Sequence, residues 1–223
     1  MPALIVADRQ TAGRGRGEHR WWTGHGALAF SLLLDPRTLG GHGTVPPPFA
    51  LAVGVSLAHV VRSHFAGGKQ DRPDVGLHWP NDVYLNDRKL AGILTEAVTP
   101  RRVIVGVGVN TNNTLDDAPP ELRAKAITLR DATGRTFDHA EFLLRWSDEL
   151  RAAIALLYAD PDALIREFQS LCVQVGRTTS LRVGEQVHVG RCLGVAPDGA
   201  LLLETAAGVR AFHTGTSSAA DAY

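Results

Sequence analysis

Apolar residues form strand-like runs and a helical repeat in turn through the first third of the chain. Ala3–Ala7 is a short apolar run between a proline and an aspartate, and it predicts a buried strand. Arg9–Gly26 is rich in glycine, charge and aromatic residues, which predicts a long loop of the kind that is usually functional or disordered. Ala27–Leu34 predicts a second strand. Phe49–Phe65 follows three prolines and repeats apolar residues at helical spacing, so we expect a helix there.

The middle of the chain combines three close strands with two helices. Gly67-Gly68 is expected to end the preceding helix. Apolar runs and turn-forming pairs predict strands at Gly76–Trp79, Lys89–Val98 and Arg102–Val109, with turns at Asn86-Asp87 and Thr99-Pro100. Asp138 with Glu141 resembles a capping box, which predicts a helix running to about Tyr158. A short helix over Asp162–Leu171 follows.

After Gly176 the pattern changes to short β runs separated by glycine turns. The predicted strands are Thr178–Val183, Gln186–Val195, Ala200–Glu204 and Val209–His213. Pro197-Asp198-Gly199 is a strong turn signal between two of them. We therefore expect an α+β protein with two domains. Residues 1–174 would form a mixed β-sheet with packed helices, and residues 175–223 a small C-terminal barrel.

The composition is that of an ordinary globular protein and excludes several function classes. Hydrophobic residues make up 44% and charged residues 21%, so wholesale disorder is not expected. Lys+Arg and Asp+Glu both number 23, which disfavours nucleic-acid binding through a general basic field. Cys172 and Cys192 lack metal-like or redox spacing, as do the histidines. No apolar run reaches the roughly 20 residues of a membrane span. With no signal peptide either, we expect a cytoplasmic protein.

The loop after the first strand is the first candidate for chemistry. Its segment Gly13–Arg16 alternates glycine with arginine, so backbone N–H groups and two guanidinium groups can surround a carboxylate or a phosphate. A mobile surface loop and an Arg-Gly RNA-binding segment are the plain alternatives. Trp21 and Trp22 follow closely. Indoles in a loop favour a stacking partner such as a purine, unless they fold back onto the core.

Two further segments place polar groups next to predicted strands. Asn81 and Asp82 follow a Trp-Pro pair at the end of one strand. They could orient a sugar-phosphate or hold Mg²⁺, or merely cap the backbone of an Asx turn. Lys89 lies on a mostly apolar strand, where a lysine either extends to water or meets a buried anion.

Glycines on two strands leave room for a close approach. Gly92 lies on the lysine strand, and Gly106 and Gly108 lie on the next one. Val103–Asn110 does not fit the dinucleotide-binding glycine pattern, since it lacks the third glycine and the following helix. A packing role for these glycines stays open.

In this order and spacing, the segments resemble those of the bacterial biotin–protein ligases. The resemblance rests on Gln10–Arg16, Trp21, His78–Asp82, Arg88–Leu94, Gly106–Asn110 and the C-terminal Gly176–Glu204, and so covers nearly the whole chain. It implies a class II synthetase-like biotin/lipoate ligase fold with an SH3-like barrel, in the single-function form without a DNA-binding domain. The implied activity joins biotin to ATP, giving biotinyl-5′-AMP and pyrophosphate. Biotin is then transferred to a lysine of a biotin carboxyl carrier domain.

The resemblance also implies which residues bind biotin. The residues implied for the ureido ring and the walls beside it are Gln10, Gly13, Arg14, Gly15, Gly92 and Gly106. Lys89 would bridge the biotin carboxylate and the α-phosphate, offsetting negative charge as the two meet. Arg16 would contact biotin as well, hold the phosphate and retain the adenylate. Lys89 and Arg16 are thus the implied catalytic residues.

The nucleotide side of the implied site uses a second group of residues. Those implied to contact ATP are Trp21 and Asn110 at the adenine and Asn81 and Asp82 at the Mg-ATP side. Mg²⁺ would accompany ATP, with Asp82 as its ligand. The implied partner is the carrier domain of a biotin-dependent carboxylase, which would add its edge strand to the sheet. Neither DNA nor a membrane is expected as a partner, and homodimer formation is left open.

The chain departs from the family's pattern at three places. Only nine residues precede Gln10, so we expect the family's front strand–helix unit to be missing. His78 stands where a lysine usually precedes Trp79, and Gly17–Arg20 replaces a more basic stretch. A catalytically impaired biotin-binding protein is therefore one alternative. A lipoate or octanoate ligase is another, although the arginine loop and the barrel disfavour it. An RNA-binding module is the weakest.

Overall fold

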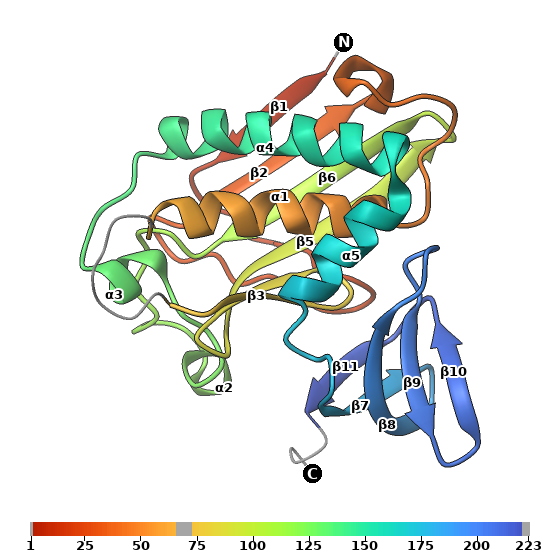
Figure 1. The fold of residues 1–223 in the computed structure, drawn as a ribbon. Helices are drawn as coiled ribbons and strands as arrows, with labels where there is room; N and C mark the ends of the chain where they lie inside the picture. The colour runs from red at the N-terminus through yellow and green to blue at the C-terminus, as the bar shows by residue number, and fades with distance from the viewer. Residues whose placement is uncertain (1, 66–72, 220–223) are drawn as a thin grey trace.

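The computed structural model describes residues 2–65 and 73–219, which form two antiparallel β-sheets (Figure 1). The larger sheet has the spatial order β1-β2-β6-β5-β4-β3. Its strands are β1 (Ala3–Ala7), β2 (Leu28–Leu34), β3 (Val75–His78), β4 (Asp82–Leu85), β5 (Arg88–Thr99) and β6 (Arg102–Val109). From β3 to β6 each strand pairs with the next in the chain. Tight turns therefore connect the part of the sheet that carries most of the candidate motifs.

The turn between β4 and β5 lies at Asn86-Asp87, as predicted. Both residues have positive φ, 51° and 57°, as in the type I′ turns that join tightly paired strands. The side-chain oxygen of Asn86 accepts a hydrogen bond from the backbone N–H of Asp74 at 3.0 Å. Asp87 forms an ion pair with Arg177 at 3.0 Å, so this turn also contacts the C-terminal part of the chain.

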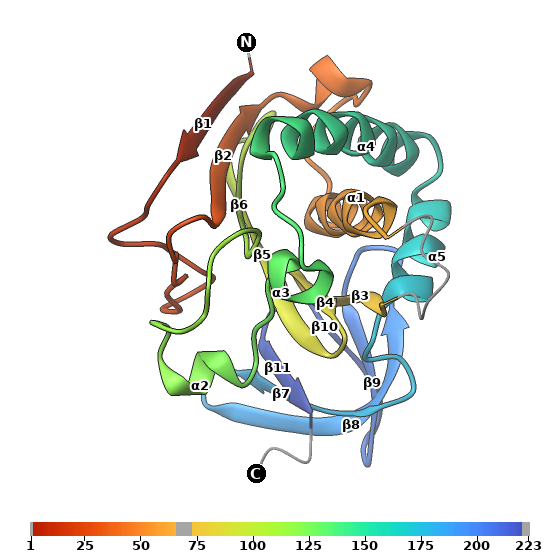
Figure 2. The same ribbon diagram turned by 90° about the vertical axis from the view of Figure 1, so that its left-hand side faces the viewer.

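Helices cover one face of the larger sheet (Figure 2). The helical segments are η1 (Pro36–Leu39), α1 (Phe49–Ser63), α2 (Pro120–Arg123), α3 (Leu129–Thr133), α4 (His139–Ala159) and α5 (Pro161–Leu171). Asp138 caps α4 by accepting hydrogen bonds from the N–H groups of Ala140 and Glu141 at 2.7 and 3.1 Å, which confirms the predicted start. Within residues 2–65 and 73–219, no helix is long and apolar enough to cross a membrane.

The main core lies between the larger sheet and helices α1 and α4. Helix α1 is buried along most of its length, as expected for a helix that is apolar all round. Phe30 of β2 meets Trp146 of α4 edge-on, with ring centroids 4.8 Å apart. The indole N–H of Trp146 donates to the buried hydroxyl of Ser56 on α1 at 3.1 Å. Sheet and helices are thus joined by one packed layer.

The smaller sheet contains the last five strands of the described chain, in the order β10-β9-β8-β7-β11. They are β7 (Thr178–Val183), β8 (Gln186–Val195), β9 (Leu201–Thr205), β10 (Gly208–Phe212) and β11 (Thr216–Ala219). The predicted turn at Pro197-Asp198-Gly199 separates β8 from β9, and Gly199 has φ of 85°. The change of texture after Gly176 therefore predicts this sheet correctly.

Trp79 joins the two sheets. Its side chain is buried, and its indole N–H donates to Gly199 O at 2.9 Å. The backbone N–H of Trp79 donates to the side-chain oxygen of Gln174 at 2.6 Å, and its carbonyl accepts from the hydroxyl of Ser217 at 2.8 Å. The segment between β3 and β4 is consequently fixed by three polar contacts with the C-terminal part of the chain.

The fold differs from the sequence prediction in strand direction, in the burial of β1 and in several short elements that were not predicted. The α+β class is confirmed, but every pairing between named strands is antiparallel, so the sheet is not mixed. Strand β1 exists but is not buried, because it lies at the edge and pairs only with β2; Ile5 is 68% exposed. Strands β4 and β11 and the short helical segments η1, α2 and α3 were not predicted. The helix end predicted at Gly67-Gly68 lies outside the described residues.

Candidate functional site

A cavity of about 420 Å³ lies on the face of the larger sheet opposite α1 and α4. Its lining comes from the loop between β1 and β2, from strands β2, β4, β5 and β6, from residues 78–81, and from residues 215–217 at the start of β11. Of the residues predicted to form the site, those in the lining are Gln10, Arg14, Gly15, Arg16, Trp21, Asn81, Asp82, Lys89, Gly92 and Gly106. The fold thus brings most of them together.

The loop between β1 and β2 folds into a small hairpin beside this cavity. The backbone N–H of Trp21 donates to Gly13 O at 3.0 Å, and Arg14 stands opposite Arg20 in an isolated antiparallel bridge. Like charges that face each other across a strand pair repel. Arg14 also contacts Glu96 at 3.5 Å, but both side chains are exposed, so that pair contributes little. The hairpin therefore concentrates positive charge where an anion would relieve repulsion.

The indole of Trp21 forms one wall of the cavity against two glycines. A Cβ atom added to Gly108 would lie 2.4 Å from the Trp21 ring, and one added to Gly92 would lie 3.2 Å from it. Only glycine lets the indole approach β5 and β6 this closely. The Nε1 of Trp21 is buried without a hydrogen-bond partner in the described part of the chain. Trp21 therefore lines the cavity instead of joining the core.

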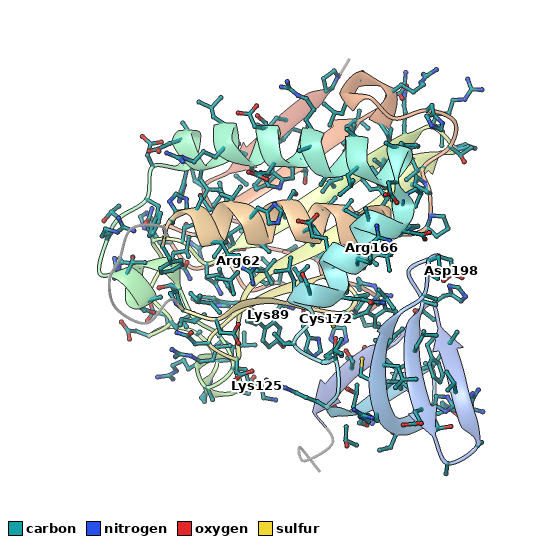
Figure 3. All side chains as sticks on the ribbon, viewed as in Figure 1. Arg62, Lys89, Lys125, Arg166, Cys172 and Asp198 are labelled. Carbon is teal, nitrogen blue, oxygen red and sulfur yellow. The ribbon has the colours of Figure 1, made fainter. Side chains whose placement is uncertain are left out.

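Lys89 places a cation at this wall. Its ammonium donates to an Asp82 carboxylate oxygen at 2.6 Å and lies 5.7 Å from the centroid of the Trp21 ring. The segment after α2 helps to fix its backbone, because the N–H of Lys89 donates to Lys125 O at 2.8 Å. Figure 3 labels Lys89 in the lower part of the larger sheet and Lys125 below it, beside α2. The lysine is about one third exposed, so a ligand in the cavity can reach it.

Asn81 and Asp82 differ in what they offer to a ligand. The side-chain amide of Asn81 donates to Ile93 O at 2.5 Å, so it already serves the backbone of β5. Asp82 instead directs its carboxylate to Lys89. The Asn81 amide is thus engaged by the backbone, while the Asp82 carboxylate belongs to the charged group in the cavity; a contact of Asn81 with ATP stays a prediction.

Arg16 brings a second cation to the lining and meets only neutral partners. Its guanidinium donates to Gly215 O at 3.4 Å and to the hydroxyl of Thr214 at 3.3 Å. Burial lowers the pKa of Arg16, and the nearby Asp82 carboxylate opposes that shift. No ion pair in the described chain includes Arg16. A partly buried guanidinium with two long, neutral hydrogen bonds is ready to bind an anion.

His78 contributes a neutral ring to the lining. Burial lowers the pKa of His78, although Asp82 and a hydrogen bond with Trp79 O act in the opposite direction. The ring stacks on Tyr84 with centroids 4.9 Å apart. Burial also raises the pKa of Tyr84 to about 12, so both rings are uncharged at neutral pH. A lysine at position 78 would add a positive charge that this chain lacks.

Three other predicted residues lie in or near the site with different surroundings. The side-chain oxygen of Gln10 lines the cavity and accepts from the hydroxyl of Thr23 at 2.9 Å. Gly13 is buried behind the lining, where a Cβ would lie 2.4 Å from Trp21 O. Asn110 is buried outside the lining and accepts from the Asn113 amide at 3.3 Å. The structure therefore does not bring Asn110 into the cavity.

Sequence reasoning missed four residues of this region as functional. Gly108 forms the wall with Trp21, and Trp79 joins the two sheets. Thr216 and Ser217 line the cavity from β11, the last strand of the C-terminal sheet, far along the chain from β5. The pair Gly106 and Gly108 did signal a close approach. By contrast, nothing in the polar sequence around Ser217 indicates that this segment lies beside the cavity.

The arrangement suits a ligand that combines an apolar ring system with anionic groups. The wall of indole and glycine is apolar, and Lys89 and Arg16 supply positive charge in the same cavity. No cluster of three or more metal-ligating side chains occurs among residues 2–65 and 73–219. Asp82 is a single carboxylate, and Mg²⁺ is commonly held by one or two carboxylates together with substrate phosphates. The residues present thus fit a metal that enters with a nucleotide.

Comparison with known proteins relates this chain to a set of ligases. Residues 1–110 match the model of the biotin/lipoate A/B protein ligase family. The chain is 32% identical over 216 residues to the biotin–[acetyl-CoA-carboxylase] ligase of Paracoccus denitrificans, which covers 92% of this chain and 85% of that protein. It is also 32% identical over 224 residues to the bifunctional ligase/repressor BirA of Bacillus spizizenii. That match covers 95% of this chain but only 64% of the longer repressor.

A solved structure has the same fold over nearly the whole chain. The biotin protein ligase from Aquifex aeolicus, solved in complex with biotin and ATP, matches with a TM-score of 0.79 and 29% sequence identity. The match covers 96% of this chain and 87% of that one. The matched region therefore includes the separate C-terminal sheet, because so little of this chain lies outside the match.

Proposed function

Because this chain belongs to the biotin–protein ligase family, we propose that it activates biotin with ATP and transfers it to a carrier protein. A carboxylate oxygen of biotin attacks the α-phosphorus of ATP, which forms biotinyl-5′-AMP and releases pyrophosphate. The amine of an acceptor lysine, after losing a proton, then attacks the acyl carbon and releases AMP. The acceptor is a biotin carboxyl carrier domain.

One observation carries this proposal: the Lys89 ammonium lies beside the wall formed by Trp21 and the glycines. Biotin has an apolar bicycle and chain that suit such a wall, and a carboxylate that suits the lysine. The reaction brings two anions together, so its barrier is largely electrostatic and positional. Lys89 offsets the charge of both anions, and Asp82 orients the ammonium through the 2.6 Å contact.

Arg16 and the hairpin supply the phosphate side of the proposed site. Arg16 has a guanidinium without an acidic partner in the described chain, and Arg14 and Arg20 add charge nearby. We assign Arg16 to the phosphate and to retention of the adenylate. Gln10 and the backbone from Gly13 to Gly15 are assigned to the ureido ring.

The nucleotide base and the metal complete the proposal. Trp21 is assigned to adenine as well as to the cavity wall, since its Nε1 lacks a partner. Asn110 reaches adenine only if its contact with Asn113 opens. Mg²⁺ would be held by Asp82 together with the phosphates, where it would neutralise their charge. A carrier domain that docks at a sheet edge, action in the cytoplasm and homodimer formation stay predictions.

Mass spectrometry of a reaction with biotin, Mg-ATP and a biotin carboxyl carrier domain tests the function. We expect one biotinyl group on one lysine of the carrier, and biotinyl-AMP when the carrier is left out. Octanoate and lipoate, offered in place of biotin, are the control for the lipoate-ligase alternative and should give no acylated carrier. Biotin binding without either product would identify a binding protein and overturn the ligase.

A further inference from the structure

The C-terminal sheet contacts the arginine hairpin directly, through residues just before and within β11. Thr214 and Gly215 accept hydrogen bonds from Arg16 at 3.3 and 3.4 Å. On the other side of the hairpin turn, the His19 ring lies 3.3 Å from the hydroxyl of Thr216. These contacts join parts of the chain almost 200 residues apart. They are the hydrogen bonds by which the hairpin tip meets the C-terminal sheet.

The segment that makes these contacts is itself fixed at both ends. The hydroxyl of Ser217 donates to Trp79 O at 2.8 Å. Gly215 has φ of 145°, and a Cβ there would lie 2.7 Å from the Leu181 side chain on β7, so glycine lets the segment pass close to that strand. Thr216–Ala219 then pairs with β7 as β11. Residues 214–217 therefore present a firm surface to a hairpin that is otherwise held mainly by its own backbone.

The tip of the hairpin, from Gly15 to His19, has little else to order it, since the packing of Trp21 and the contact of Arg14 with Glu96 lie at its base. Its internal hydrogen bonds run from Gly15 N to His19 O at 2.8 Å and from His19 N to Arg16 O at 3.1 Å. Gly17 at its tip has φ of 59° and nothing within 4 Å of where a Cβ would stand. Mutual repulsion between Arg14 and Arg20 works against the closed form. External contacts are thus needed to keep Arg16 at the cavity before an anion arrives.

We propose that residues 214–217 of the C-terminal sheet act as a strap that closes the arginine hairpin over the cavity, with Thr214 as a positioning residue for Arg16. Thr214 lies outside the cavity lining and acts through the guanidinium, whereas Thr216 supports the tip through His19. In the proposed function, which this inference deepens, the strap aims Arg16 at the phosphate and slows escape of the adenylate. The C-terminal sheet is then part of the active site.

A variant with both Thr214→Val and Thr216→Val tests the strap without any ligand. Valine keeps the β-branched shape and replaces the hydroxyl with a methyl group that cannot form a hydrogen bond. Hydrogen–deuterium exchange over residues 11–21 should become about fivefold faster. The reason is that each lost hydrogen bond changes the opening equilibrium of the hairpin by a factor of about five or less. The matched control is Thr178→Val, an exposed threonine at the start of β7 with no side-chain contact to the hairpin. Unchanged exchange in the double variant would overturn the strap.

Release of preformed biotinyl-AMP tests the positioning role of Thr214. The Thr214→Val variant should release biotinyl-AMP about fivefold faster than the parent, and Thr214→Ser should release it at the parent rate. In a chain that already carries Arg16→Met, adding Thr214→Val should cause no further acceleration. An equal acceleration in both backgrounds would show that Thr214 does not act through Arg16. If the parent chain forms and binds no biotinyl-AMP, the proposed function fails, while the exchange measurement still decides the strap.

Discussion

Alternate residues of strands β5 and β6 point to opposite faces of the sheet. One face packs against the helices, and the other leaves space for the cavity. Toward the helices the strands present branched side chains such as Ile93 and Val107, which are buried at 2% and 4% exposure. Toward the cavity they present Gly92, Gly106 and Gly108, which leave room for the Trp21 ring and a ligand. Gly92 pairs with Gly108, and Ile93 with Val107, so the two faces are in register across the strands.

The difference shows how one sheet separates stability from function. Side chains alternate between the two faces of a strand, so neighbours in sequence belong to different environments. The helix face contributes to folding by burying apolar area. The cavity face gives up that burial and gains a space with Lys89 at its side. Substitutions on adjacent residues should therefore have separable effects.

Removal of the cation on the cavity face should have the largest effect. Lys89→Ala should lower the rate of biotinyl-AMP formation by about two orders of magnitude or more, because the charge of the two reacting anions is no longer offset. The midpoint of urea unfolding should change little. Lys125→Ala, an exposed lysine whose backbone pairs with Lys89, is the matched control. Near-normal adenylation by the Lys89 variant would remove the basis of the proposed mechanism.

Paired substitutions at the adjacent positions 108 and 109 sharpen the comparison between the faces. Gly108→Ala places a methyl group in the space of the Trp21 ring and should weaken biotin binding roughly tenfold, with little loss of stability. Val109→Ala removes buried methyl groups outside the cavity lining and should cost about 1–2 kcal/mol of unfolding free energy, with binding retained. Isothermal titration calorimetry and urea unfolding measure the two quantities. If both variants lost biotin affinity and unfolding free energy equally, the two faces of the sheet would not have separate roles.

A smaller effect is expected from a histidine on the helix side of the molecule. Burial beside Phe137 and Phe142 lowers the pKa of His64, with Arg145 and Arg135 adding to the shift and Glu141 opposing it. As pH falls below the ordinary histidine value of about 6.5, the unfolded chain takes up this proton first, so stability falls. The stabilising contribution is complete above that value and declines below it.

Replacement of that histidine by phenylalanine tests the sign. His64→Phe should lose less unfolding free energy than the parent between pH 7 and pH 5, measured by urea unfolding at each pH. A steeper dependence in His64→Phe would contradict the assigned direction.

Strands with a clear period and clear turns could be predicted from the sequence alone. Thr178–Val183 and Gln186–Val195 have the predicted bounds, because glycine-containing turns delimit both runs. Strand β11 was missed, since Thr216–Ala219 is small and polar and forms a strand only through pairing with β7. Burial of β1 was predicted wrongly because an apolar run does not reveal whether a strand lies at a sheet edge. Position within a sheet is a tertiary property.

The candidate site shows the same limit. The hairpin, Lys89 and the glycines carry local signals of charge and space, and the structure places them around one cavity. Asn81 has the same residue type as a ligand-binding group, yet its amide is used by β5. Thr214 and Ser217 carry no local signal at all. Their contribution arises from the way the C-terminal sheet returns to Trp79.

The four tryptophans of the chain have an optical consequence. Trp79 and Trp146 are buried at 1% and 2% exposure with satisfied indole N–H groups, so their emission should be blue-shifted and constant while the fold is intact. Trp21, with its unpartnered N–H and a lysine ammonium near its ring, lies where a ligand would change its surroundings. The indole that shapes the cavity is therefore also a built-in fluorophore that reports occupancy without any added label.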